Sequence, residues 1–182
     1  MRIHPYVIML TAAAVTGAPS PDATSPEVLA TQVTDACAII RPALGGKVEG
    51  DIHFEKTGDA VSITGRISGL APGRHGFHIH MYGNCSAPDA ASAGDHFNPA
   101  RHDHGGPKDQ NRHAGDLGNI EAGADGIVNV SLSDTVISLS GPNGILGRSV
   151  VIHQNADDLK SQPSGESGPR LACGVIGVAP PK

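Results

Sequence analysis

The sequence predicts an all-β protein, an eight-stranded antiparallel Greek-key β-barrel or sandwich with two long functional loops. Three observations lead to this fold class. Short runs alternate apolar and polar residues with the period of two that is typical of half-buried strands. The 182 residues include 24 Gly and 14 Pro, counts that favour many turns over long helices. Aromatic residues make up only 3%, so Val, Ile and Leu must supply most of the core.

The expected strands follow one another along the chain, with turn signals between most of them. They span residues 37–40, 48–55, 61–67, 74–80, 117–120, 127–132, 148–153 and 171–178. In the second strand, His53 falls on the polar face and is expected to be solvated rather than ligating. Residues 81–115 and 154–169 show no periodicity. Loops of this length without secondary structure are normally functional or disordered, and we expect the first to be organised by metal.

The N-terminal segment is expected to lie outside the folded domain. Residues 1–18 combine a short polar start, an apolar stretch and the small residues Thr16-Gly17-Ala18, which are the features of a secretory signal peptide. The alternative is an uncleaved anchor, but the apolar stretch is short for a membrane-spanning helix. Residues 19–32 are interpreted as a flexible leader. We therefore expect one domain over 33–182, secreted to an extracellular or periplasmic location, with no membrane association of the mature form.

The charge of the chain gives no indication of a nucleic-acid partner. The formal net charge is −5 at pH 7, and the sequence contains neither a basic run nor an aromatic stacking motif. Nucleic-acid binding is therefore not expected.

The three cysteines of an exported chain predict one disulfide and one spare thiol. Cys37 lies in the apolar run 36–40, where we interpret it as a small buried hydrophobic residue. Lipid attachment at Cys37 is the weaker alternative, because it lies far beyond the apolar stretch of the signal. Cys85 and Cys173 remain as the expected pair.

Histidines and one aspartate carry the main functional signal. The pair His78 and His80 places two imidazoles on one face of a strand, because side chains alternate along it. Further ligand-type residues follow where strands meet loops: His96, His104, His113, Asp116 and His153. Any of the loop histidines alone would more often be solvated. Together the set is too large for one metal but suits two if one imidazole is shared, and its nitrogen-rich character favours copper or zinc over calcium or magnesium.

Several motifs spread over residues 37–179 resemble those of the copper/zinc superoxide dismutase family. They are GFHIH at 76–80, HFNP at 96–99, HGGP at 104–107, HAGDLGN at 113–119, ADDL at 156–159 and RLACGVIG at 170–177. Motifs of this length in this order are highly specific.

Carried over to this sequence, the resemblance implies two metal sites with one shared ligand. Copper would be bound by His78, His80, His96 and His153, and zinc by His96, His104, His113 and Asp116. Asp157 resembles the carboxylate that links a copper histidine to a zinc histidine, here His78 and His104. His75 resembles the supporting histidine just ahead of the first motif. Such partners fix the orientation and tautomer of ligand rings.

The reaction implied by the resemblance is the dismutation of superoxide to oxygen and hydrogen peroxide. Copper would alternate between Cu(II) and Cu(I), and His96 would take up a proton. Zinc suits the structural site because it has no redox chemistry and prefers closed tetrahedral coordination. Arg170 resembles the arginine at the mouth of the copper channel, where a fixed cation docks an anionic substrate. His96 and Arg170 are thus the expected catalytic residues.

Two segments depart from the familiar cytosolic members of the family. Cys85 follows His80 by five residues, in an altered version of the segment that makes the family's dimer contacts, so a homodimer and a monomer both stay open. The stretch 154–169 is shorter, and its candidates for charged guidance residues are Lys160 and Glu166. Ser164 is expected to line the channel.

Two other functions would use the same fold. They are the dismutase-like domain of a copper chaperone and an extracellular metal buffer or adhesion module. All four copper positions and Arg170 are present, which favours the enzyme over both. The intact zinc-type ligands disfavour a copper-only variant.

Overall fold

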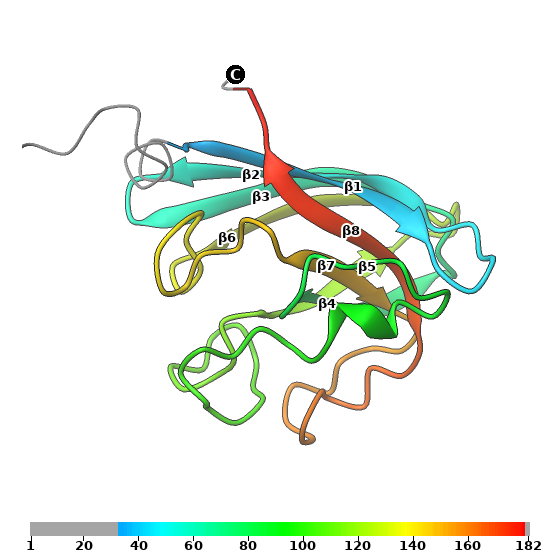
Figure 1. The fold of residues 1–182 in the computed structure, drawn as a ribbon. Coiled ribbons are helices and arrows are strands. Elements are labelled where there is room, and N and C mark those ends of the chain that lie inside the picture. The colour runs from blue at the N-terminus through cyan, green and yellow to red at the C-terminus, as the bar shows by residue number, and fades with distance from the viewer. Residues whose placement is uncertain (1–32, 181–182) are drawn as a thin grey trace, which may run out of the picture.

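Eight antiparallel strands form nearly all the regular structure of residues 33–180, the part of the chain described by this computed structural model (Figure 1). They are β1 (Asp35–Pro42), β2 (Glu49–Thr57), β3 (Ala60–Ser68), β4 (Gly73–His80), β5 (Asp116–Ala122), β6 (Val128–Asp134), β7 (Ser149–His153) and β8 (Arg170–Val178), with one 3₁₀ turn, η1 (Ala91–Ala93). The predicted eight-stranded all-β fold is confirmed, and each expected strand overlaps an observed one. The expected signal peptide and leader, 1–32, lie outside the described residues. No helix within 33–180 is long and apolar enough to cross a membrane.

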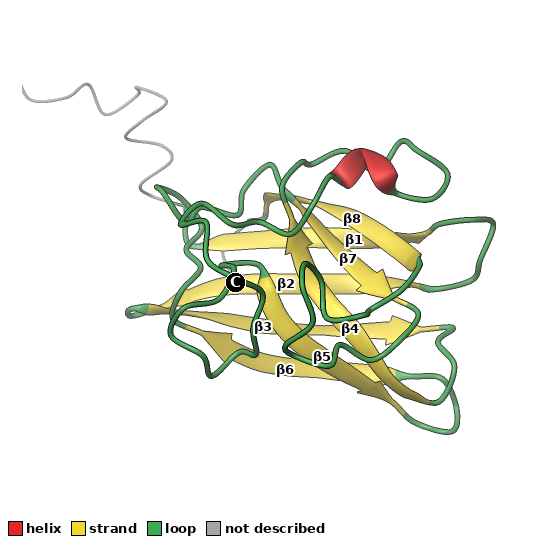
Figure 2. Cartoon of the chain, turned by 90° about the horizontal axis from the view of Figure 1, so that it is seen from below, coloured by secondary structure: helices red, strands yellow, loops and turns green. Residues whose placement is uncertain are grey.

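The strands form one sheet with the order β5-β4-β7-β8-β1-β2-β3-β6, and the sheet curls into a nearly closed barrel (Figure 2). All neighbouring strands are antiparallel. The order is not sequential, because the chain crosses the barrel between β3 and β4 and again between β6 and β7. These crossings bring β4 and β7 side by side, and the two long irregular stretches begin where these strands end.

Strand β4 has one face toward the barrel interior and the other toward the two long loops. Phe77 and Ile79 pack into the hydrophobic core, while His78 and His80 point to the opposite face, as alternation along a strand requires. All four side chains are nevertheless buried. The outer face is covered by the stretches 81–115 and 154–169. In these stretches the carbonyl oxygens of Gly94 and Gly168 accept hydrogen bonds from His80 and His153. The histidines therefore lie between the barrel and its two loops.

The first long loop is attached to β4 by backbone hydrogen bonds. The N–H of Ile79 donates to Gly115 O at 2.9 Å, and Ile79 O accepts from the N–H of Phe97 at 2.8 Å. Gly115 must be glycine, because a Cβ there would lie 2.2 Å from Ile79 O. This close contact places His96 and Asp116, the neighbours of Phe97 and Gly115, at the same end of β4.

The interpretation of Cys37 as a buried residue is wrong. Ala36, Ala38 and Ile40 of β1 face the core, so alternation turns Cys37 and Ile39 outward, and Cys37 is a partly exposed free thiol. The apolar run hides this alternation, because the outer face of β1 also carries an apolar residue, Ile39, which is 50% exposed. The sequence therefore lacks the polar contrast that would reveal the outward positions.

A disulfide joins Cys85, in the first long loop, to Cys173 of β8 with a Cα–Cα distance of 5.8 Å. This is the expected pairing. The two cysteines are separated by 88 positions in the chain, and the loop they close contains His96 and the residues up to β8. The bond thus attaches the loop that carries His96 directly to the barrel.

Replacing Cys85 by Ser should lower the free energy of unfolding by up to about 4 kcal/mol, because the open chain gains conformational entropy when unfolded. Denaturant unfolding of the two proteins without reductant measures the difference. Cys37→Ser is the matched control and should change stability little. Equal unfolding midpoints for wild type and Cys85→Ser would contradict a stabilising role of the disulfide.

Candidate metal centre

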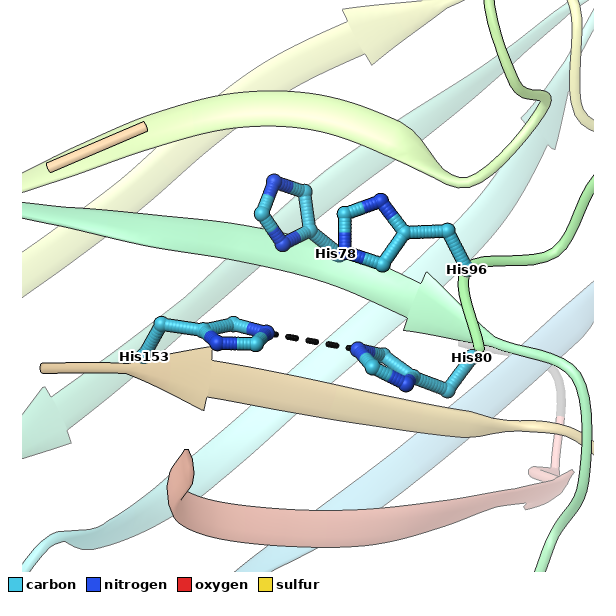
Figure 3. A group of neighbouring side chains, drawn as sticks. All are labelled: His78, His80, His96 and His153. Carbon is cyan, nitrogen blue, oxygen red and sulfur yellow. Dashed lines mark hydrogen bonds between the residues drawn. The ribbon is translucent and has the colours of Figure 1, made fainter. Parts of the chain in front are cut away.

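Four histidines converge on the outer face of β4 and β7 (Figure 3). His78 and His80 come from β4, His153 from the end of β7, and His96 from the first long loop. One ring nitrogen of each lies within 4.8 Å of the others, and all four residues are buried. His80 Nε2 and His153 Nε2 face each other at 3.3 Å, and the rings of His78 and His96 are 4.0 Å apart between centroids.

A second group of donors shares His96 and adds His104, His113 and Asp116. The carboxylate oxygen Oδ1 of Asp116 lies 2.8 Å from His96 Nδ1, 3.1 Å from His104 Nδ1 and 3.2 Å from His113 Nδ1. The other oxygen, Oδ2, accepts from the N–H groups of Gly105 and His113. Backbone donors therefore fix the carboxylate at the centre of three imidazoles.

Four of the ring nitrogens that face these two groups make no directed hydrogen bond. His78 Nδ1 and His96 Nε2 are buried without a hydrogen-bond partner, and His104 Nδ1 and His113 Nδ1 lie beside Asp116 Oδ1 but outside hydrogen-bond geometry. A buried polar atom that makes no hydrogen bond is costly, so four of them in one place indicate a partner of another kind. Four histidine nitrogens for one ion, and three with a carboxylate for another, fit copper and zinc. The residues present thus fit both metals.

The outward-facing nitrogens of the rings, in contrast, have protein partners. His80 Nδ1 lies 2.8 Å from Gly94 O and His153 Nδ1 lies 3.1 Å from Gly168 O. A ring that donates from Nδ1 keeps an unprotonated Nε2 available as a ligand. Burial is the largest cause that lowers the pKa of His153 to about 3 and of His96 to about 4, with neighbouring histidines adding to it. Burial likewise lowers the pKa of His80 well below its ordinary value.

Asp157 connects the two donor groups from behind. Its Oδ2 lies 2.8 Å from His78 Nε2 and its Oδ1 lies 2.9 Å from His104 Nε2, with all three side chains buried. Burial acts to raise the pKa of Asp157, but the hydrogen bonds from His104 and His78 outweigh it and hold the pKa well below its ordinary value. The group is therefore ionised, and it accepts from both rings. The same pattern holds the pKa of Asp116 far below normal, against burial, through its three histidines.

His104 and His75 differ from the other histidines in their surroundings. Burial acts to lower the pKa of His104, but the adjacent carboxylates of Asp116 and Asp157 outweigh it and raise the pKa to about 9. His75 lies with Nδ1 2.9 Å from His153 O and Nε2 2.9 Å from Ala71 O. It therefore supports the backbone at the end of β7, directly before the second loop begins.

Sequence reasoning missed three side chains that hold the ligand-bearing segments. The amide of Asn119 bonds both backbone groups of Asp157, at 2.9 and 2.7 Å, and the amide of Gln162 bonds both backbone groups of His104, at 3.0 and 2.8 Å. The guanidinium of Arg112 donates to His113 O and to the carboxylate of Asp134. Nothing in the sequence marks these long-range partners. His102, in contrast, lies outside both groups.

A cavity of about 450 Å³ opens onto the first group of histidines and is lined by His80, His96 and His153. Arg170 lies in its wall, where it donates to Ala90 O and Gly94 O, each at 2.7 Å. Ser164 also lines the cavity, as expected, whereas Lys160 and Glu166 are not among its lining residues. The cavity therefore offers one buried end with imidazoles and a fixed cation beside them.

Comparison with known proteins gives a consistent result. The family model described as copper/zinc superoxide dismutase matches residues 48–176. The chain is 43% identical over 158 residues to the extracellular superoxide dismutase [Cu-Zn] of Brugia pahangi, covering 82% of this chain and 78% of that protein. It is 47% identical over 156 residues to a superoxide dismutase [Cu-Zn] of Onchocerca volvulus, covering 80% and 96%. A solved structure titled as the clock protein EA4 aligns with a TM-score of 0.75 at 42% identity, covering 81% of this chain and 96% of that one.

Proposed function

The chain belongs to the copper/zinc superoxide dismutase family, and from this premise we propose which of its residues carry the family's reaction. The protein is an oxidoreductase that converts two superoxide anions and two protons into oxygen and hydrogen peroxide, with copper and zinc as cofactors. Bound copper supplies one-electron exchange with superoxide, and zinc supplies a fixed charge without redox chemistry. The steps assigned to individual side chains below are our proposal.

The proposed ligands are the two donor groups around His96. His78, His80, His96 and His153 would hold copper, and His96, His104, His113 and Asp116 would hold zinc. The observation that carries this assignment is the position of His96. Its Nδ1 lies 2.8 Å from Asp116 Oδ1, while its Nε2 is buried among the other histidines without a hydrogen-bond partner. One imidazole therefore presents a nitrogen to each group.

We propose that His96 carries a proton used in the reaction and that Arg170 binds the substrate anion. The product peroxide needs protons, and His96 lines the cavity where they are required. The Arg170 guanidinium is held by two carbonyl groups in the wall of the same cavity, so it can dock an anion without reorganisation. Asp157 and His75 would orient the rings and the strand end that carry the ligands.

The protein reconstituted with copper and zinc should consume superoxide, and removal of the metals by a chelator should abolish this activity. Return of copper and zinc should restore it, whereas zinc alone should not. His96→Ala should lose the activity and weaken retention of both metals, measured by metal analysis after dialysis. Metal binding without superoxide consumption would favour the chaperone-like or metal-buffer alternatives instead.

We also propose that the mature protein is secreted. The chain resembles a relative named as extracellular, and a disulfide is typical of oxidising compartments. The signal-like segment 1–18 agrees with this location.

A homodimer is our proposal for the oligomeric state. The adjacent strands β1 and β8 expose three apolar side chains, Ile39 at 50%, Val175 at 44% and Val178 at 65%. Exposed apolar residues on neighbouring strands favour association of two copies. Ile39→Glu should therefore shift the protein to a monomer in analytical ultracentrifugation, while Asn129→Glu, on the exposed side of β6, should not. A wild-type protein that sediments as a monomer at micromolar concentration would refute the proposal.

A further inference from the structure

The cavity above the histidines contains a cation that the sequence did not indicate. Its charged lining residues other than histidine are Asp95, Arg101 and Arg170. Arg170 was expected there, whereas Arg101 lies in the first long loop, three residues before the zinc-type histidine His104. The cavity thus carries two guanidinium groups and one carboxylate, in a chain whose formal net charge is −5.

The positive charge of Arg170 is partly offset by its neighbours. Burial lowers the pKa of Arg170, whereas the negative charges of Asp95 and Asp89 act to raise it. Both carboxylates are therefore close enough to interact with this guanidinium, and they reduce its field at a distance. Arg170 is therefore well placed to hold an anion that has arrived, and it contributes less to attraction from solution than an uncompensated cation would.

Arg101 has no such compensation. Its side chain is exposed, and no ion pair or side-chain hydrogen bond of Arg101 occurs among residues 33–180. A residue that is exposed and also lines the cavity stands where the cavity meets solvent. Its charge is therefore more accessible to an incoming anion than that of Arg170, which is only partly exposed.

The backbone at Arg101 is held in a conformation that side chains rarely adopt. Its φ is 57°, in the left-handed region that favours glycine. The loop is fixed in this form by Asn98, whose side-chain amide bonds both the carbonyl and the N–H of His102, at 2.7 and 3.0 Å. Unfavourable backbone conformations of this kind tend to cluster at functional sites. Here the strain presents an unpaired guanidinium to the cavity.

We propose that Arg101 is the cation that draws superoxide into the cavity, where Arg170 then docks it. This inference rests on the proposed function of the site. An anion is repelled at long range by a chain of negative charge, so capture depends on a local positive field, and focusing by such fields raises association rates. The exposed position also makes the effect sensitive to salt, because ions screen exposed charges within about 10 Å at 0.1 M ionic strength.

The test uses the full chain reconstituted with copper and zinc, with metal content checked in every variant. Arg101→Gln and Arg101→Gly should lower the rate of superoxide decay about threefold at low ionic strength and weaken its salt dependence. Arg101→Lys should retain both, because it keeps the charge. Arg66→Gln removes the same charge from an exposed position on β3 outside the cavity and should behave as the wild type.

Azide provides a second readout that does not depend on turnover. Its affinity, followed by visible absorption of the copper-loaded protein, should fall about threefold in Arg101→Gln and Arg101→Gly but not in Arg66→Gln. If azide affinity depends on Arg101 while the wild type consumes no superoxide, the capture role stands and the proposed function fails. If both Arg101 variants match Arg66→Gln in rate, salt dependence and azide affinity, the proposal is overturned. It is also overturned if Arg101→Gly, which relieves the backbone, behaves as the wild type.

Discussion

Replacing Arg170 by Ile is expected to lower the rate of superoxide decay about tenfold and to weaken its dependence on ionic strength. The guanidinium of Arg170 lies in the wall of the cavity that also contains His80, His96 and His153. It is held by Ala90 O and Gly94 O at 2.7 Å each, so the cation is fixed beside the imidazoles. An isoleucine removes the charge and leaves an apolar surface where the substrate must dock. Copper should stay bound, since Arg170 belongs to neither donor group.

Arg170→Lys separates the charge from the geometry of the guanidinium. A lysine keeps a point charge in the cavity but cannot reproduce the pair of hydrogen bonds to two carbonyl groups. Because the charge is kept, Arg170→Lys should retain most of the activity and the salt dependence. The measurement is the superoxide decay rate of the three proteins against ionic strength, with copper content determined in each. An Arg170→Ile protein with the wild-type rate and salt dependence would show that docking depends on another cation.

The strands could be predicted because their signal is local. The run 61–67 alternates Val61, Ile63, Gly65 and Ile67 with polar residues, and β3 spans Ala60–Ser68 with Val61, Ile63 and Ile67 in the core. The same period of two predicts from local sequence alone that His78 and His80 share one face of β4. Cys37 shows where this reasoning ends, because a strand with apolar residues on both faces contains no local contrast.

The supports of the metal centre could not be predicted, because they join residues that are distant in sequence. Gln162 bonds the backbone of His104 across 58 positions, and Asn119 bonds that of Asp157 across 38. A single Asn or Gln in a sequence does not indicate which distant backbone groups its side-chain amide will bond. The cavity position of Arg101 depends on a loop conformation fixed by Asn98, and the left-handed φ of a non-glycine residue has no sequence signal either. Local patterns thus gave the ligand-type residues, while their positioning required the folded chain.

Asp157→Asn is expected to weaken metal retention by roughly 10–100-fold, the usual effect of losing a carboxylate that orients ligand histidines. The carboxylate of Asp157 accepts from His78 on one oxygen and from His104 on the other, at 2.8 and 2.9 Å. An asparagine has one acceptor oxygen and a donor amide, so one ring must face a donor instead of an acceptor. Both donor groups contain one of these two histidines, and we therefore expect the loss to affect copper and zinc together. Titration of the loaded proteins with a chelator measures it.

Asp158→Asn is the matched control, because Asp158 is the next residue but its exposed carboxylate accepts from Lys160 and Ser161 and contacts no ring. The two variants make the same chemical change at adjacent positions, so a difference between them reports the contacts of Asp157 with the rings and not the altered charge. Asp158→Asn should release both metals as the wild type does. Should Asp157→Asn also release them at wild-type chelator concentrations, His78 and His104 must be oriented by their own strand and loop.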